Sequence, residues 1–374
     1  MPLRSVLLRS VLLLSVSVAV ACLGGEPARE LPEPAGEERY REILAEEAGV
    51  GVGAVELARL AAGDSVWISG RMDRLAAAIA PEGSSGEKGW REVFAGLRAD
   101  HPRDVEEVLA AYRAEVERAR SFVLARGLIT LPPGPLTVEE TPAFLAETRY
   151  PLIAYLGYRL VVTAGDGERL ADHCRACVPP LAVHETYPGH HAAFLHQRSG
   201  AGPDSEIAPE LALRAGEHFK NRFFHEGWGQ YAEVLMLEAG YYDGEPEREL
   251  GAWRNLLFRV ERARIDALLH SGTLSPEAAA AELAGFVDPE TAEAEVERHL
   301  AEPTLKAAYY VGLLQILELR EAVAAADAEM DLRAFHDRLV RWPLPIPEIA
   351  RERFGVEIGT GLSEGGLAGS IGRR

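Results

Sequence analysis

Three histidines and a glutamate lie close together in residues 184–191, which read His-Glu-Thr-Tyr-Pro-Gly-His-His. Imidazole nitrogens are common zinc ligands, and a glutamate beside them can accept a proton from water activated by the metal. A His-Glu pair followed by another histidine on one helix is typical of zinc hydrolases. The segment therefore predicts a metal centre with Glu185 as its general base.

The spacing of these histidines differs from the simple His-Glu-x-x-His pattern, because Pro188 stands four residues after His184. On a regular helix, His190 would point about 240° from His184, and His191 would lie roughly 10 Å further along the axis. Pro188 and Gly189 could support a bulge in the helix that absorbs two residues. We therefore predict His184 and His190 as ligands, with His191 as the alternative ligand or a residue behind the ligands.

A third ligand is expected from another helix. Residues 223–233 read Phe-Phe-His-Glu-Gly-Trp-Gly-Gln-Tyr-Ala-Glu, and Glu226 and Glu233 share one helical face. A solvated acid explains either glutamate alone, but the pair together with the His-Glu segment favours a metal site. We predict that Glu226 completes a site for one zinc ion per chain, and that Glu233 orients a ligand histidine.

Two later segments could supply substrate contacts. Arg262, Asp266 and His270 are four residues apart, so they share a helix face that could line a cleft. Tyr309 or His270 could donate to the oxyanion that develops during hydrolysis, and Arg259 or Arg262 could bind a peptide carboxylate. Asp266 would then support these groups from behind. An Arg262–Asp266 salt bridge within the helix, and a core position for Tyr309, are the simpler alternatives.

The elements that must position these residues are expected to be helices. Alanine, leucine, glutamate and arginine recur throughout, whereas aromatic residues make up only 7%. Apolar residues of 105–122 recur at three- and four-residue spacings, and Ser275 and Asp288 each precede a proline, which is typical of a helix start. We predict a mainly α fold with little or no sheet. One helical catalytic domain with a cleft would span 37–358, before a flexible glycine-rich tail over 359–374.

The first residues indicate export. Arg4 and Arg9 precede a twelve-residue apolar run that ends at Ala21, whereas a membrane span needs about 20 residues. We interpret 1–21 as a signal peptide. Small residues directly before Cys22 resemble a bacterial lipobox, so we expect a lipid on Cys22 and a flexible tether over 22–36. The protein would be held on the periplasmic side of a bacterial membrane. A plain secretory signal is the alternative.

Charge and cysteine content narrow the function further. The 374 residues carry a net charge of −19, which argues against nucleic acid as a partner. With Cys22 lipidated, only Cys174 and Cys177 remain. In an exported protein they could form a small disulfide, or they could be redox-active or bind metal with His173. The disulfide is the simplest interpretation.

Several motifs together resemble the bacterial family called domain of unknown function 885, which is grouped with zincin-type metallopeptidases. The family is marked by His-Glu-x-x-Pro-Gly-His-His, as in 184–191 here. Its other motifs match Glu-Gly-Trp-x-x-Tyr-x-Glu at 226–233, Arg-x-x-Arg-x-x-x-Asp-x-x-x-His at 259–270, Pro-x-x-x-x-x-Tyr-x-x-Gly at 303–312 followed by Arg320, Phe-His-Asp at 335–337 and Pro-Leu-Pro at 343–345.

The resemblance covers about 140–350 in consistent order. It implies a largely helical fold like that of the long-cleft zinc peptidases, and it implies no known substrate. Family members are often considerably longer on the N-terminal side, so this chain is short where a substrate wall or lid would lie.

These patterns predict an exported zinc-dependent hydrolase that cleaves peptide or related amide bonds. Two other classes of protein remain open. A non-haem iron enzyme can also use two histidines and one carboxylate, although such sites usually lie on β-barrels and strand patterns are scarce here. A non-catalytic lipoprotein could bind a peptide or a partner protein, although a pure binding site needs no general base such as Glu185.

Overall fold

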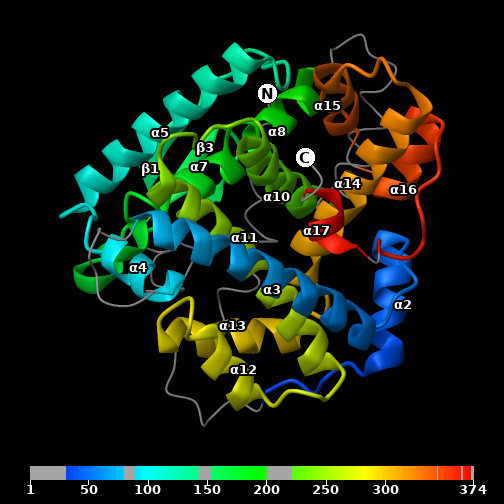
Figure 1. Ribbon diagram of the computed structural model, residues 1–374, viewed down its shortest axis with the longest axis horizontal. Coiled ribbons are helices and arrows are strands. Elements are labelled where there is room, and N and C mark those ends of the chain that lie inside the picture. The colour runs from blue at the N-terminus through cyan, green and yellow to red at the C-terminus, as the bar shows by residue number, and fades with distance from the viewer. Residues whose placement is uncertain are drawn as a thin grey trace, which may run out of the picture.

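The chain forms helices over most of its length, and a computed structural model describes residues 31–79, 89–142, 153–199, 221–342, 344–363 and 365–371 (Figure 1). The N-terminal half contains α2 (Glu37–Ala48), α3 (Ala54–Ile79), α4 (Trp90–Leu97), α5 (Val105–Arg126), β1 (Thr137–Glu140), β2 (Ile153–Tyr155), β3 (Arg159–Val162), η2 (Gly167–His173) and α7 (Val178–Glu185). The remainder contains α8 (His190–Ser199), α10 (Arg222–Glu238), α11 (Pro246–His270), α12 (Pro276–Leu283), α13 (Pro289–Ala301), α14 (Ala307–Ala326), α15 (Leu332–Val340), α16 (Ile346–Ile349), η3 (Ala350–Phe354) and α17 (Gly366–Ser370). The predicted mainly α fold is confirmed.

Helix boundaries follow local signals in the sequence. The expected helix over 105–122 is α5, and its predicted apolar stripe is largely buried. Ser275 caps α12 by accepting from the backbone N–H of Ala278, and Asp288 caps α13 by accepting from that of Thr291. In both cases a proline at the first helical position starts the helix, because its missing N–H would have no partner there.

Two pairs of long helices form the centre of the molecule. Helix α3 packs along α11, and α10 packs along α14 (Figure 1). The second pair meets backbone to backbone, because a methyl group on Gly227 would lie 2.6 Å from the Cα atom of Gly312. This close approach brings α14 against the helix that carries Glu226.

A small sheet and a helical hairpin flank these helices. The strands lie in the order β1-β3-β2, with β1 parallel and β2 antiparallel to β3. Helix α7 packs between α5 and α10 and also contacts β2. Helices α12 and α13 pack against each other at the lower edge of Figure 1 and bury a second, smaller core around Ile265 and Val296.

Both expected flexible ends are partly tied to the body. The predicted signal peptide and Cys22 lie outside the described residues, but the end of the expected tether is anchored. Ala35 donates its backbone N–H to Nδ1 of His270 at 3.0 Å, and Gly36 donates to the carbonyl oxygen of His270. None of the described helices is long and apolar enough to cross a membrane.

The expectation of a loose tail over 359–374 is wrong for part of that segment. Helix α17 packs on α3, with Leu367 fully buried. The backbone N–H groups of Leu367 and Ala368 donate to the buried carboxylate of Asp64. The glycine content indicated flexibility, but a carboxylate more than 300 residues away supplies acceptors that hold the segment.

Cys174 and Cys177 are joined by a disulfide just before α7. The predicted disulfide is therefore present, in place of the alternatives of a redox-active pair or a metal site with His173. The disulfide precedes the helix that ends at His184 and Glu185. It is compatible with an exported protein, since such bonds persist in oxidising compartments.

Candidate metal centre

The His-Glu segment breaks into two helices. We expected one helix with a two-residue bulge; instead α7 ends at Glu185 and α8 begins at His190. Pro188 has no N–H to continue the helix. The turn is held from α10, because the indole N–H of Trp228 donates to the carbonyl oxygens of Pro188 and Gly189 at 3.1 Å.

The turn between the helices requires a glycine. A methyl group on Gly189 would lie 1.8 Å from the carbonyl oxygen of His184, so the chain folds back directly onto the end of α7. This return places His190 beside His184, with their ring centroids 4.7 Å apart. The break between the two helices therefore brings His184 and His190 together, as the bulge was predicted to do.

The structure brings His184, His190 and Glu226 together. One donor atom from each lies within 4.8 Å of the others, and these are the only three described residues that form such a metal-binding group. Oε2 of Glu226 lies 3.4 Å from Nε2 of His184 and 3.7 Å from Nε2 of His190. Two ligands on one tetrahedral zinc ion at about 2.0–2.1 Å are about 3.3 Å apart, so the two distances from Glu226 are close to those of a zinc site.

Glu233 fixes the orientation of the His184 ring. Its Oε1 accepts from Nδ1 of His184 at 2.8 Å, and its Oε2 accepts from the amide of Asn255 at 2.7 Å. A carboxylate can only accept, so the Nδ1 atom of His184 carries a proton, and its Nε2 atom faces Glu226. Either a proton or a metal ion between Nε2 and the Glu226 carboxylate would satisfy both atoms at this separation of 3.4 Å.

The electrostatics of these residues also favour a cation. Burial lowers the pKa of His184, but hydrogen bonds to Glu226 and Glu233 outweigh it and raise the pKa to about 9. Burial raises the pKa of Glu226, but His184 and His190 hold it well below its usual range. The centre thus contains the ionised carboxylate of Glu226 beside a buried imidazole, and a metal ion would compete with the proton for the position between them.

Glu185 lies at the end of α7, next to His184 in sequence, and is only partly exposed. Burial raises the pKa of its carboxyl group, while His190 and His184 oppose that effect. Glu226 and Arg259 also act on this carboxyl group electrostatically. Glu185 therefore faces the same polar region as the three donor residues, as expected for a general base.

Tyr309 and Arg259 lie next to the three donor residues. The ring of Tyr309 stacks on that of His184, with centroids 5.9 Å apart, and burial raises the pKa of its hydroxyl. The guanidinium carbon of Arg259 lies 4.5 Å from the centroid of the Tyr309 ring. Arg262 also lies near this ring, but its guanidinium is paired with Glu295 at 2.9 Å. Two arginines were predicted to bind a carboxylate. Arg262 is already paired with Glu295, whereas Nε of Arg259 has no hydrogen-bond partner in the described part of the chain.

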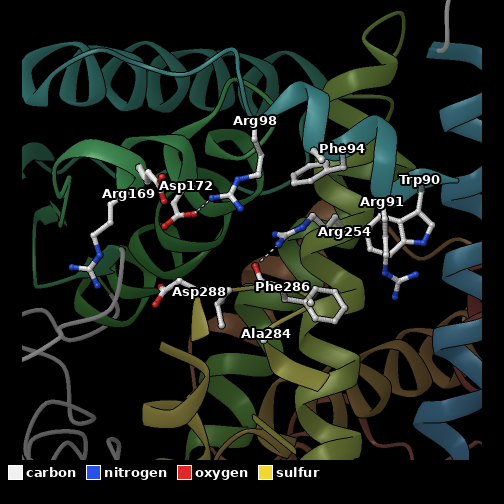
Figure 2. Close-up of a pocket in the computed structure, with 14 residues that line it drawn as sticks. Trp90, Arg91, Phe94, Arg98, Arg169, Asp172, Arg254, Ala284, Phe286 and Asp288 are labelled. Carbon is white, nitrogen blue, oxygen red and sulfur yellow. Dashed lines mark hydrogen bonds and ion pairs between the residues drawn. The ribbon is translucent and has the colours of Figure 1, made fainter. Parts of the chain in front are cut away.

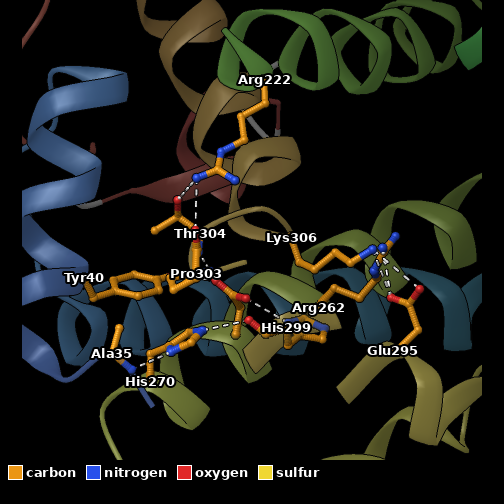
Figure 3. Close-up of polar contacts among 11 residues, drawn as sticks. Ala35, Tyr40, Arg222, Arg262, His270, Glu295, His299, Pro303, Thr304 and Lys306 are labelled. Atoms are coloured by element: carbon orange, nitrogen blue, oxygen red, sulfur yellow. Dashed lines mark hydrogen bonds and ion pairs between the residues drawn. The ribbon is translucent and has the colours of Figure 1, made fainter. Parts of the chain in front are cut away.

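Asp266 and His270 do not belong to the centre, which corrects their predicted roles. Asp266 accepts from Tyr40, His299 and the backbone of Thr304, and Nε2 of His270 donates to the carbonyl oxygen of His299 (Figure 3). The four-residue spacing did place them on one face of α11. However, a helix rises about 1.5 Å per residue, so His270 lies roughly 16 Å along the axis from Arg259. No salt bridge joins Asp266 to Arg262 in the described part of the chain.

His191 also points away from the three donor residues. Its Nδ1 atom lies 2.9 Å from the hydroxyl of Tyr155, and its ring contacts those of Tyr155, Tyr158 and Tyr187. Burial lowers its pKa to about 4, so the ring is neutral. The predicted role of His191 behind the ligands is therefore not supported by its contacts, which place it in a cluster of aromatic side chains.

Three residues that support the site have no predicted role: Trp228 and Asn255 hold it by hydrogen bonds, and Gly229 leaves room for the ring of His184. Trp228 belongs to the Glu-Gly-Trp motif and Gly229 follows it directly, so their position close to Glu226 was an available signal. No local pattern distinguishes Asn255, which reaches Glu233 from the middle of α11.

Replacing Gly229 with alanine should weaken zinc binding without removing a ligand. The added methyl group would lie 2.5 Å from Cε1 and 2.6 Å from Nε2 of His184, whose ring is fixed by Glu233. Displacing a ligand in this way should cost roughly 10- to 100-fold in zinc affinity. Competition with a chromophoric chelator measures it. Gly63→Ala on α3, where a methyl group meets nothing within 4 Å, is the matched control and should match wild type.

The two adjacent histidines should differ in their effect on the metal. His190→Ala removes a donor atom and should cost more than the roughly 10- to 100-fold that loss of an outer hydrogen bond costs. His191→Ala should retain the metal, because its contacts are to Tyr155 and neighbouring rings. Zinc titration of both variants checks this. The reverse ranking would mean that His191 replaces His190 as the ligand.

Comparisons with known proteins agree with this fold. The family model described as "Bacterial protein of unknown function (DUF885)" matches residues 18–346. A provisionally assigned lipoprotein from Colwellia psychrerythraea has a similar structure, with a TM-score of 0.73 and 21% identity over 85% of this chain and 56% of the other. Another, of unknown function, from Shewanella oneidensis has a TM-score of 0.70 and 25% identity over 91% of this chain and 63% of the other.

This chain spans less than two thirds of the length of either structure. No curated protein matches it. The family match covers most of the chain and includes the segments that carry His184, His190, Glu226 and Glu233. The chain therefore belongs to the family of bacterial proteins of unknown function designated DUF885.

Proposed function

We propose that the protein is an exported zinc-dependent hydrolase that acts on peptide or related amide bonds. The observation that carries the proposal is the orientation of His184. Its Nδ1 atom contacts Glu233, its Nε2 atom contacts Glu226, and its ring adjoins that of His190. A buried ring held between two carboxylates in this way is suited to bind a metal ion, and hydrogen bonding to the far nitrogen is usual for zinc-bound histidine.

Zinc is the ion that this donor set fits best. Two imidazoles and one carboxylate form the ligand set of many catalytic zinc sites, and they leave one tetrahedral position open. Zinc held by His184, His190 and Glu226 would supply Lewis acidity to the substrate carbonyl and to water at that position.

Glu185 supplies the proton transfer in this proposal. Its carboxylate would accept a proton from the attacking water and then donate it to the leaving amine. Partial burial raises its pKa, which makes it a stronger base than an exposed glutamate. A binding site without chemistry would have no need of a base beside its ligands.

Tyr309 and Arg259 would act on the substrate. The Tyr309 hydroxyl remains protonated at neutral pH because burial raises its pKa, so it can donate to the developing oxyanion. Arg259 stacks on the Tyr309 ring, and Nε of this guanidinium has no hydrogen-bond partner in the described part of the chain. A free carboxylate of the substrate would provide such a partner.

The same proposal places the protein on the outer side of a bacterial membrane, held by lipid on Cys22. The lipobox-like segment and the lipoprotein names of the two similar structures support this location. Labelling with a fatty-acid analogue should mark wild type and leave Cys22→Ser unlabelled. An unlabelled wild type would indicate an ordinary secreted protein, because stable anchoring needs covalent lipid.

A screen of the purified protein against a peptide library tests the activity. Cleavage should occur with zinc, stop after dialysis against a chelator and return when zinc is restored. Peptide binding without cleavage would favour the non-catalytic lipoprotein. Restoration by ferrous iron and not by zinc would favour the iron enzyme, which uses the same ligand types.

A further inference from the structure

A cavity lies apart from the metal centre. Its volume is about 470 Å³, and it opens between α4, η2, α11 and the turn that joins α12 to α13 (Figure 2). We call it the arginine pocket, after Arg98 and Arg254 on its walls. None of the donor residues of the metal centre lines it. A function for this cavity would therefore be additional to hydrolysis at the metal.

Arg254 is a cation without a counter-ion at the wall of the arginine pocket. It donates one N–H to the carbonyl oxygen of Phe286, and its guanidinium carbon lies 4.7 Å from the centroid of the Phe94 ring. No carboxylate of the described residues lies within ion-pairing distance of it. Burial, together with the charge of Arg98, lowers its pKa to about 10 against the opposing effect of Asp172. A partly buried guanidinium in this state is stabilised by an anion.

The second arginine is only partly neutralised. Arg98 pairs with Asp172 at 2.6 Å, and Figure 2 shows both beside Arg254. Asp172 is therefore the ion-pair partner of Arg98 and acts on Arg254 only through its charge at longer range. Four arginines and three carboxylates line the whole pocket, so it is positive within a chain of net charge −19. Local positive charge against an acidic background favours small anions over cations.

The remaining walls are aromatic. Trp90 and Phe94 come from α4, and Phe286 comes from the α12–α13 turn. The rings of Trp90 and Phe286 lie 6.5 Å apart. Such walls bind an apolar or planar body, while the arginines fix the orientation of its charged end.

We propose that the arginine pocket binds a small organic anion. Its carboxylate or phosphate would contact Arg254 and Arg98, and its apolar body would lie against Phe94 and Phe286. Arginine suits both head groups because its planar fork donates two parallel hydrogen bonds. The pocket is large enough for a ligand of drug size, since known ligand sites occupy roughly 300–1,000 Å³.

Titration of the full-length protein with simple probes tests the proposal. The probes are benzoate, phenyl phosphate and neutral benzyl alcohol, and binding is followed by calorimetry and by the intrinsic tryptophan fluorescence, to which Trp90 contributes. Benzoate or phenyl phosphate should bind saturably, and benzyl alcohol should not compete. Binding of phenyl phosphate alone would assign a phosphate ligand, and binding of both would assign the shared anion chemistry. Absence of saturable binding of either anion up to about 10 mM would overturn the proposal.

Variants locate the bound probe. Arg254→Gln should weaken binding about tenfold or more, because a charge-assisted hydrogen bond is lost. Arg98→Gln should also weaken it, which keeps the test available if the first variant does not fold. Arg264→Gln is the matched control, because this arginine lies on the same helix, outside the pocket, and should bind like wild type. Equal binding by wild type and a folded Arg254→Gln or Arg98→Gln would contradict the assignment.

A further titration distinguishes binding in the arginine pocket from binding at the metal centre. Anions also bind to zinc sites, so the titration is repeated on chelator-treated protein and on Glu226→Ala. Binding should persist in both, because neither treatment touches a pocket residue. Loss of binding there would place the anion at the metal and overturn the proposal. Persistence would support it whether or not the protein proves to be a hydrolase.

Discussion

Glu226→Ala is expected to yield protein without metal. Glu226 is the only carboxylate among the three donor residues, and its Oε2 atom lies between the two imidazoles. Its removal leaves two neutral nitrogens, which bind zinc far less tightly than the full set. The affinity should fall by more than the roughly 100-fold cost of losing an outer hydrogen bond. Metal analysis of the dialysed variant measures it.

The control for this variant is Glu247→Ala, which removes an exposed glutamate from the first turn of α11. It should retain one zinc ion per chain. If Glu226→Ala kept its zinc, the metal would be held by other residues, and the centre described here would not be the binding site.

Glu185→Gln is expected to separate metal binding from chemistry. The amide keeps the shape of the side chain but cannot accept a proton from water. Zinc should therefore remain, while turnover falls by roughly 10² or more. Zinc content and peptide cleavage, measured on the same preparation, test both statements. Thermal unfolding should change little, because no described residue depends on the Glu185 carboxylate for a hydrogen bond.

The two variants should thus lose different properties: Glu226→Ala should lose the metal, and Glu185→Gln should lose turnover. Loss of metal in Glu185→Gln together with retention in Glu226→Ala would exchange their assigned roles. Full turnover in Glu185→Gln would remove the general base from the mechanism, and Tyr309 or a second acid would have to act in its place.

The spacing of ligand types could be predicted from sequence because it follows helical periodicity. Glu226 and Glu233 are seven residues apart, so one helix face presents both of them to the end of α7. The backbone between His184 and His190 could not be predicted in this way. Its turn depends on Trp228, whose indole N–H comes from another helix and binds the carbonyl oxygens of the turn.

The sequence also could not show what packs against each face of a helix. Arg262, Asp266 and His270 were correctly placed on one face of α11, but periodicity does not reveal what packs against that face. In the structure, Asp266 and His270 hold Tyr40 and the segment that enters α2 (Figure 3). Long-range contacts of this kind arise only when the helices are assembled.

The metal content of wild-type protein tests the central claim most directly. The protein is purified with supplemented zinc, dialysed and analysed for all transition metals. The arrangement of His184, His190 and Glu226 predicts one zinc ion per chain, with the zinc lost in Glu226→Ala. Iron in place of zinc, or wild-type protein that holds no metal, would contradict the account.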